Sequence, residues 1–220
     1  MSDFKPIGGT VRARAAGELR DRILTGRLRR GSRLDLDEIT REFGTSRTPV
    51  REALLELSYE GLVEVTPRSG ITVLGITPGD AVDNFAVLAT LSGKAAEWAT
   101  QRISRPELEE LHALARAVEA ADDVVAANWS FHRALNRASG SPLLLTYLRQ
   151  AVRVVPASYF ELFPEQVRRS RDDHAGLLEA IDRGDAPTAR ALTEAHVLDA
   201  GAALGDWLTA RETEPAPPGA

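Results

Sequence analysis

The sequence predicts a mainly α-helical protein, with an N-terminal winged helix-turn-helix and a C-terminal antiparallel bundle of six (six or seven) helices. Two observations support this fold class. Residues 36–57 hold two short helical patterns around a glycine turn, and two runs of alternating apolar and polar residues follow them. From residue 77 onward, helical spacing of apolar residues repeats six times between short breaks. Short connections place successive helices antiparallel.

The composition is that of a globular protein. Of the 220 residues, 43% are hydrophobic and 27% are charged, and no apolar run is long enough to cross a membrane. There is no cysteine, which excludes disulfides and thiolate metal sites. Because the first residues also lack the apolar core of a signal peptide, we expect a cytoplasmic protein without membrane contact.

The charge is distributed unevenly along the chain. The net charge is −5, but residues 1–76 hold 13 Lys/Arg and 11 Asp/Glu, whereas the remainder holds 14 and 21. A weakly basic first part joined to an acidic second part suits a nucleic-acid-binding module attached to a regulatory one.

The first domain is expected to span residues 1–76. Thr10 can cap a first helix that ends near Gly26. The loop that follows is the most basic stretch of the chain and carries Arg27, Arg29, Arg30 and Arg33. Asp35 then precedes Glu38 by three residues, as in the capping box that opens a helix.

The next helix is the centre of the prediction. Gly44 supplies a tight turn, Ser46 or Thr48 can cap the helix, and Pro49 falls in its first turn, where a missing N–H costs little. An apolar stripe of this helix faces inward, at Val50, Leu54 and Leu57. Beside that stripe lie the candidate DNA-contacting residues Ser46, Arg47, Thr48 and Arg51.

Two arginines and a hydroxyl on the first turns of a helix suit contact with phosphates and guanine edges in a major groove. The alternative is a solvated helix whose arginines pair with Glu52 or Glu56. After this helix, residues 63–65 and 71–73 are expected to form a hairpin. Arg68 and Gly70 at its tip are further candidates for DNA contact, although a turn glycine beside a solvated arginine explains them as well.

The second domain is expected to span residues 77–210. Its helices are predicted at about 77–102, 104–121, 122–139, 141–163, 164–184 and 185–209, with a possible break at Pro156. The tail 211–220 is rich in proline and charge and is expected to be disordered.

The first domain resembles the GntR family of bacterial transcription regulators. The resemblance rests on the run Leu36–Gly44, on Ser46–Leu54 with the order Ser-Arg-Thr-Pro-Val-Arg-Glu-Ala-Leu, and on Glu60–Val63. It implies a winged helix that binds double-stranded DNA, with the wing tip facing the DNA.

The second domain resembles the FCD ligand-binding domain of the FadR-like GntR subfamily. The resemblance rests on Phe131–Leu135, Ala138–Leu144, Asp173-His174, Ala180–Ala186 and Glu194–His196. Six helices rather than seven indicate the VanR-like branch.

Three of the four histidines are candidates for a metal site. Asn128 and His132 are four residues apart on one helical face, and His174 and His196 lie on the last two helices. The resemblance implies that these three imidazoles and one oxygen ligand meet inside the bundle, a donor set suited to Zn, Ni or Mn. The alternative is a metal-free cluster hydrogen-bonded to itself and to water. His112 lies outside this pattern.

Two positions depart from the family. Metal-binding members carry Asp where this chain has Asn128. A carboxamide is neutral, so we expect weaker metal binding, or dependence on an anionic effector. Members also often carry Arg and Glu where this chain has Leu88 and Ser92, which puts the usual acid-binding contact in doubt. The remaining candidates for an anionic effector, possibly a carboxylate, are Arg133, Arg153 and Arg169; each could equally be solvated.

The sequence therefore predicts a ligand-responsive regulator and not an enzyme. It is expected to act as a homodimeric repressor that binds a palindromic operator and is released or retuned by a small molecule, a metal or both. Two alternatives remain open. One is a metal-dependent enzyme that uses the histidine cluster, although no nucleophile–base pair supports it. The other is a DNA-binding protein whose bundle is purely structural.

Overall fold

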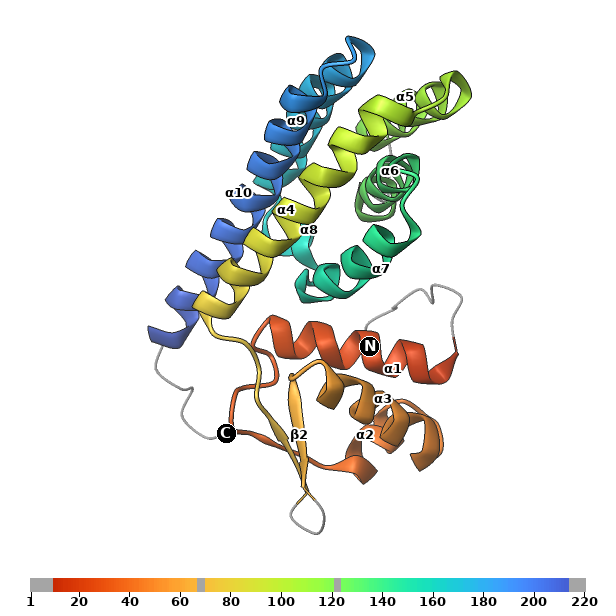
Figure 1. Ribbon diagram of the computed structural model, residues 1–220. Helices are drawn as coiled ribbons and strands as arrows, with labels where there is room; N and C mark the ends of the chain where they lie inside the picture. The colour runs from red at the N-terminus through yellow and green to blue at the C-terminus, as the bar shows by residue number, and fades with distance from the viewer. Residues whose placement is uncertain (1–9, 67–69, 121–123, 214–220) are drawn as a thin grey trace. The chain divides into compact units, whose positions relative to one another are not determined.

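The computed structural model describes residues 10–66, 70–120 and 124–213 (Figure 1). The described residues form two compact units, one with residues up to 77 together with 211–213, and the other with residues 78–210. The first unit holds three helices and a small sheet, and the second is wholly helical. The predicted fold class is confirmed. In the described part of the chain, no helix is long and apolar enough to cross a membrane.

The helices of the first unit begin where the sequence predicts. They are α1 (Val11–Leu24), α2 (Leu36–Glu42) and α3 (Arg47–Tyr59). Thr10 accepts a hydrogen bond from the backbone N–H of Ala13, and Asp35 accepts two at the start of α2, so both caps are confirmed. α1 packs on α3 through the fully buried alanines Ala15, Ala16 and Ala53. Small side chains let these two helix backbones approach closely and hold α3 in place.

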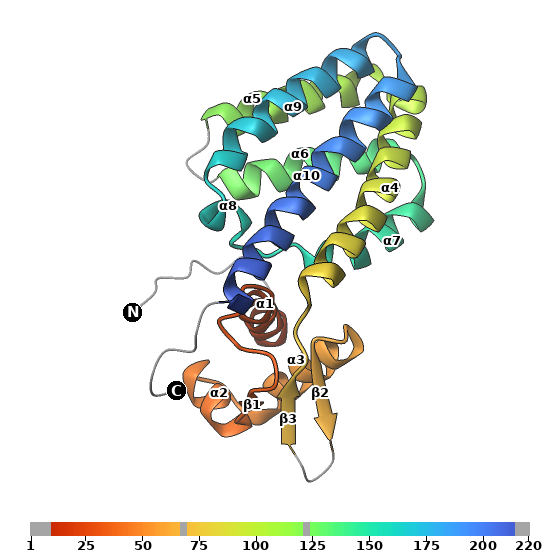
Figure 2. The ribbon, with the colours of Figure 1, turned by 90° about the vertical axis from the view of Figure 1, so that its left-hand side faces the viewer.

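The sheet contains one more strand than predicted. It consists of β1 (Arg33–Leu34), β2 (Val63–Thr66) and β3 (Gly70–Val73), in the antiparallel order β1-β3-β2. Figure 2 shows the three strands side by side. β2 and β3 confirm the predicted hairpin. β1 was not predicted because two residues are too few to show an alternating pattern, and β1 exists through its pairing with Ile71 and Thr72.

Six main helices build the second unit as far as the structure describes it. They are α4 (Pro78–Arg102), α5 (Arg105–Ala120), α6 (Val124–Ala138), α7 (Pro142–Ala151), α9 (Glu165–Asp182) and α10 (Ala186–Thr213). The 141–163 segment is not one helix: α7 gives way to a 3-10 turn η1 (Val152–Val154), and a short α8 (Tyr159–Leu162) follows. Pro156 explains the break, because the residue before a proline avoids the α conformation and Val155 is extended.

The last helix runs past its expected end near residue 209. α10 continues to Thr213, so the first residues of the predicted tail 211–220 are helical. The remainder of that tail, residues 214–220, lies outside the described residues.

The core of the second unit centres on Phe131, which has no exposed surface. The apolar side chains around it come from α4, α5, α6, α9 and α10 and include Ala96, Leu111, Leu135, Leu178 and Ala189. Burying a phenylalanine of this kind contributes roughly 1.5–3 kcal/mol, and such residues fix how the five helices pack.

α4 and α10 pack against each other at glycines. A Cβ added at Gly201 would lie 2.4 Å from the Cβ of Phe85, and one at Gly205 would lie 2.8 Å from a methyl of Val82. The later glycine of α10 meets the earlier residue of α4, so the two helices are antiparallel, as Figure 2 shows. Glycine at these positions lets α4 and α10 approach closely.

Candidate functional site

α3 presents its polar side away from the core of the first unit. Its buried residues are Val50, Ala53, Leu54 and Leu57. The candidate DNA-contacting residues Ser46, Arg47, Thr48 and Arg51 are all exposed. Ser46 is the N-cap residue, but its side chain makes no capping hydrogen bond, so its hydroxyl is available to another partner.

The two arginines of α3 differ in their partners. Arg47 donates from Nε and Nη2 to the two carboxylate oxygens of Asp37 on α2, at 2.7 Å each. Arg51 forms no hydrogen bond or ion pair with any residue that the structure describes. Neither arginine pairs with Glu52 or Glu56; Glu56 instead binds Arg20 of α1. α3 therefore exposes two guanidinium groups. That of Arg47 is paired with Asp37, and that of Arg51 is available to a partner from outside the described residues.

The wing supplies one further exposed candidate. Gly70 opens β3 with φ near 100°, a conformation that other residues rarely adopt. Arg68 lies outside the described residues.

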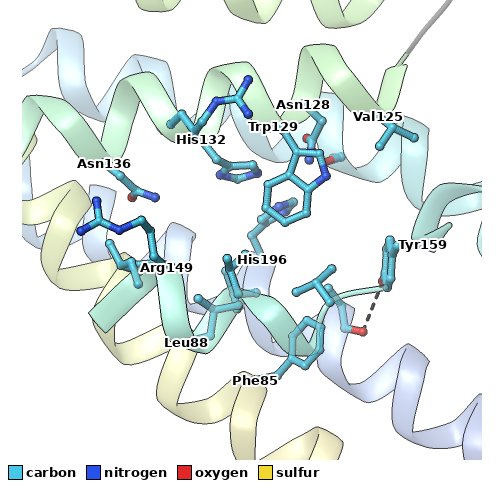
Figure 3. Close-up of a pocket in the computed structure, with 18 of the residues that line it drawn as sticks. Phe85, Leu88, Val125, Asn128, Trp129, His132, Asn136, Arg149, Tyr159 and His196 are labelled. Atoms are coloured by element: carbon cyan, nitrogen blue, oxygen red, sulfur yellow. Dashed lines mark hydrogen bonds between the residues drawn. The ribbon is translucent and has the colours of Figure 1, made fainter. Parts of the chain in front are cut away.

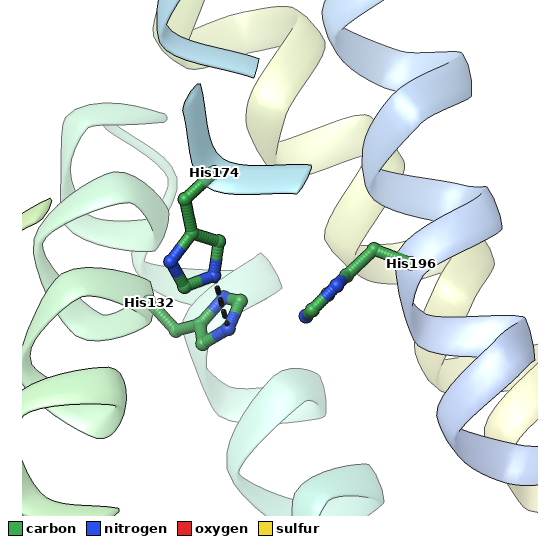
Figure 4. A group of neighbouring side chains, drawn as sticks. All are labelled: His132, His174 and His196. Carbon is green, nitrogen blue, oxygen red and sulfur yellow. Dashed lines mark hydrogen bonds between the residues drawn. The ribbon is translucent and has the colours of Figure 1, made fainter. Parts of the chain in front are cut away.

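Three histidines from three helices meet inside the second unit (Figure 4). His132 comes from α6, His174 from α9 and His196 from α10, and one ring nitrogen of each lies within 4.8 Å of the others. The Nε2 atoms of His132 and His174 are 3.3 Å apart. His196 uses Nδ1 to contact a carboxylate oxygen of Asp173 at 2.8 Å. This contact leaves Nε2 of His196 available to the cluster.

The surroundings keep two of these imidazoles neutral. Burial and the nearby His196 lower the pKa of His132 to about 3. Burial, followed by the two other histidines, also lowers the pKa of His174, whose ring stacks on Phe131 with centroids 4.1 Å apart. A neutral imidazole has a free lone pair on one nitrogen, so His132 and His174 are ready to act as ligands at neutral pH.

The cluster fits a divalent transition metal. Two imidazole nitrogens on one tetrahedral Zn²⁺ lie about 3.3 Å apart, and the pair formed by His132 and His174 already has this spacing. The Nδ1 atom of His174 is buried and has no hydrogen-bond partner among the described residues. In the metal-free alternative, one of these two imidazoles donates its Nε2–H to the Nε2 lone pair of the other, so the same contact fits a hydrogen bond as well. The unpaired Nδ1 of His174 does not distinguish the two arrangements.

Asn128 faces a different partner. Its Oδ1 accepts a hydrogen bond from the hydroxyl of Ser170 on α9 at 3.2 Å, and both side chains are buried. One of the two lone pairs of this predicted oxygen ligand therefore accepts a hydrogen bond from the protein. His112, placed outside the cluster by its sequence position, instead lies 3.0 Å from Asp182.

A cavity of about 490 Å³ adjoins the histidines (Figure 3). His132, His196 and Asn128 line it, and so do Leu88 and Ser92 of α4. Its apolar lining includes Phe85, Trp129, Leu148, Tyr159 and Val197. The hydroxyl of Tyr159 donates to the backbone carbonyl of Ala200 at 3.2 Å, and this bond ties α8 to α10 beside the cavity.

Of the three arginines predicted to bind an effector, the structure places one in the cavity lining. Arg133 lines the cavity, whereas Arg153 and Arg169 do not, and Arg169 pairs with Asp199. Two lining arginines, Arg137 and Arg149, were not identified from the sequence. Extending the helical face of His132 by four residues in each direction would have found Asn136 as well as Asn128. No sequence signal relates Arg149 on α7 to that face.

The comparisons with known proteins agree with both units. Residues 11–73 match the family described as bacterial regulatory proteins, gntR family, and residues 83–199 match the FCD domain. The chain is 26% identical over 194 residues to an HTH-type transcriptional regulator of Mycobacterium tuberculosis, covering 85% of this chain and 78% of that protein. It is 28% identical over 197 residues to the "Probable D-xylose utilization operon transcriptional repressor" of Paenarthrobacter nicotinovorans, covering 85% and 87%.

A solved structure shares the fold. Escherichia coli McbR/YncC superposes with a TM-score of 0.68 at 23% identity, covering 94% of this chain and 100% of that chain. Together, the two domain matches span most of the chain in the order that the fold requires. The chain belongs to the GntR family of bacterial transcription regulators and carries an FCD domain as its second unit.

Proposed function

We propose that this protein is a ligand-responsive repressor that acts in the cytoplasm and binds a palindromic operator as a homodimer. Two observations carry the proposal together. α3 exposes two arginines, of which Arg51 has no partner among the described residues, and the FCD domain holds a cavity beside three histidines. The first feature suits DNA binding, and the second suits a regulatory ligand.

The dimer follows from the geometry of DNA reading. One winged helix contacts a single half-site, and two copies related by a two-fold axis contact a palindrome with a fixed spacing. The residues proposed to contact DNA are Ser46, Arg47, Thr48, Arg51, Arg68 and Gly70.

The regulatory ligands are proposed to be a divalent metal, an organic effector or both. His132, His174 and His196 would hold the metal, with Asn128 as the proposed oxygen ligand. Three imidazoles favour Zn or Ni, and Mn is a third candidate. When bound, the metal would supply positive charge to the cavity wall. Ligand binding changes operator affinity only if the two arrangements of the dimer bind the ligand with different affinity.

The experiment that tests the function starts from the purified protein. Selection from a random duplex library should yield a palindromic sequence, and size-exclusion chromatography with light scattering should show a dimer. Recovery of no preferred sequence would overturn the DNA-reading function.

The regulatory part is tested separately, by operator binding with and without EDTA and with added Zn²⁺. We expect operator affinity to change with metal in the wild type but not in His174→Ala, which lacks one ligand. An operator affinity that never responds to metals or to organic acids would instead favour a purely structural bundle.

A further inference from the structure

The cavity beside the histidines has an uneven distribution of charge. Three arginines line it, namely Arg133, Arg137 and Arg149. No Asp or Glu from the described part of the chain is among its lining residues. A cavity with several guanidinium groups and no carboxylate favours an anionic ligand.

Two of these arginines are available to a ligand. Arg133 donates only to the hydroxyl of Ser130 at 3.0 Å, and Arg149 only to that of Thr146 at 2.8 Å, within the described residues. Both guanidinium groups are exposed. Arg137 differs, because Glu110 lies 3.7 Å from it and offsets part of its charge. Arg133 on α6 and Arg149 on α7 are therefore the stronger anchors.

Much of the remaining wall is apolar. Figure 3 shows Asn136 and Arg149 on one side of the cavity and Val125 and Tyr159 on the other, with His196 between them. Phe85, Leu88 and Trp129 add further apolar surface. A small hydrophilic diacid would leave this surface wet, whereas an apolar chain or ring would cover it.

We infer that the cavity binds an amphiphilic monocarboxylate, with its acid group held by Arg133 and Arg149 and its apolar body against Phe85, Trp129 and Tyr159. This inference rests on the proposed ligand-responsive function and adds to it the chemical class and the orientation of the ligand. Leu88 is part of the selection, because this buried leucine of the cavity lining offers no partner to a second charged group.

The test uses octanoate as the probe and isothermal titration calorimetry on the full-length protein. Four related compounds change either the length of the apolar chain or the charged group of octanoate: hexanoate, acetate, octanol and succinate. Octanoate should bind on the order of tenfold more tightly than hexanoate, because two methylenes are removed from water. Octanol, which lacks the charge, and succinate, which lacks the apolar body, should bind much more weakly than octanoate.

Substitutions locate the acid group. Arg133→Ala and Arg149→Ala should each weaken octanoate binding about tenfold, and the double variant should weaken it further. Arg116→Ala, an exposed arginine of α5 that does not line the cavity, is the matched control and should bind octanoate normally. Circular dichroism establishes that each variant is folded.

Three outcomes would overturn the inference. They are octanol binding as tightly as octanoate, unchanged octanoate binding in the double arginine variant, and binding that disappears with EDTA while the arginine variants bind normally. The last result would place the carboxylate on a metal. Operator binding without octanoate is measured alongside: its absence counts against the proposed function, and its presence without octanoate binding counts against the ligand class alone.

Discussion

Arg47 at the start of α3 and Asp37 on α2 form a two-point ion pair, with both hydrogen bonds 2.7 Å long. Both side chains are more than half exposed, at 69% and 54%, so water screens the pair and it contributes little to stability. Its consequence is geometric: it fixes the direction of one guanidinium, while Arg51 one turn further along α3 has no such partner among the described residues.

This difference predicts unequal roles in DNA binding. Arg51→Ala should cost about 1–3 kcal/mol of operator binding, because an available guanidinium that contacts a base is lost outright. Arg47→Ala should cost less operator-binding free energy, because the wild-type Arg47 must first give up its ion pair with Asp37 before it can contact DNA. Fluorescence anisotropy with operator and random duplexes measures both, with Arg116→Ala as the control. Equal losses on both duplexes would make these arginines phosphate contacts, and a larger loss for Arg47→Ala would contradict the ranking.

The contact between His196 and Asp173 predicts an effect on metal affinity without loss of a ligand. Asp173 accepts from Nδ1 of His196 and so directs its Nε2 toward the cluster. Asp173→Asn should weaken Zn²⁺ binding about 10- to 100-fold, measured by competition with a chromophoric chelator. Asp172→Asn changes an exposed neighbour and should leave the affinity unaltered. If the two substitutions weakened Zn²⁺ binding equally, Asp173 would act only through its negative charge and not by orienting His196.

Local patterns of the sequence were enough to predict most of the fold. Helix caps such as Thr10 and Asp35 and the hairpin of β2 and β3 depend on residues close in sequence, where spacing is informative. β1 depends on pairing with a strand almost forty residues later, and no local pattern signals it. The break after α7 could only be suspected, because proline breaks some helices and merely bends others.

The candidate site was less predictable, for a similar reason. Family resemblance indicated the three histidines that the structure brings together, but resemblance does not show which partners their neighbours choose. Ser170 occupies the oxygen of Asn128 from another helix, and Arg149 reaches the cavity from α7. Both facts depend on how the helices pack.

Asn128 provides a test of the metal site. Replacing it with Asp keeps the size and the hydrogen bond from Ser170 but adds a negative charge to the cavity wall beside His132. Asn128→Asp should tighten Zn²⁺ binding on the order of 10- to 100-fold and reduce any dependence on an added anion, since the protein then supplies that charge.

The matched control is Asn136→Asp, on the same helix and also in the cavity lining. It should have a smaller effect, because Asn136 belongs to the side of the cavity with Arg149, as Figure 3 shows. Native mass spectrometry and chelator competition measure both variants. Unchanged Zn²⁺ affinity in Asn128→Asp would show that position 128 lies too far from the ion to matter.

The close approach of α4 and α10 predicts a large effect from one methyl group. In Gly201→Ala the new Cβ would lie 2.4 Å from the Cβ of Phe85 and 2.7 Å from its Cγ. The Cβ of Phe85 cannot move without the backbone of α4, so the variant should lose about 1–3 kcal/mol of unfolding free energy in urea. Gly176→Ala is the control: its Cβ would meet only a methyl of Leu192 at 3.9 Å, and it should gain up to about 1 kcal/mol from helix propensity. Equal stabilities of the two variants would mean that α10 can slide along α4. In that case Phe85, which lines the cavity, would be free to adapt to a ligand.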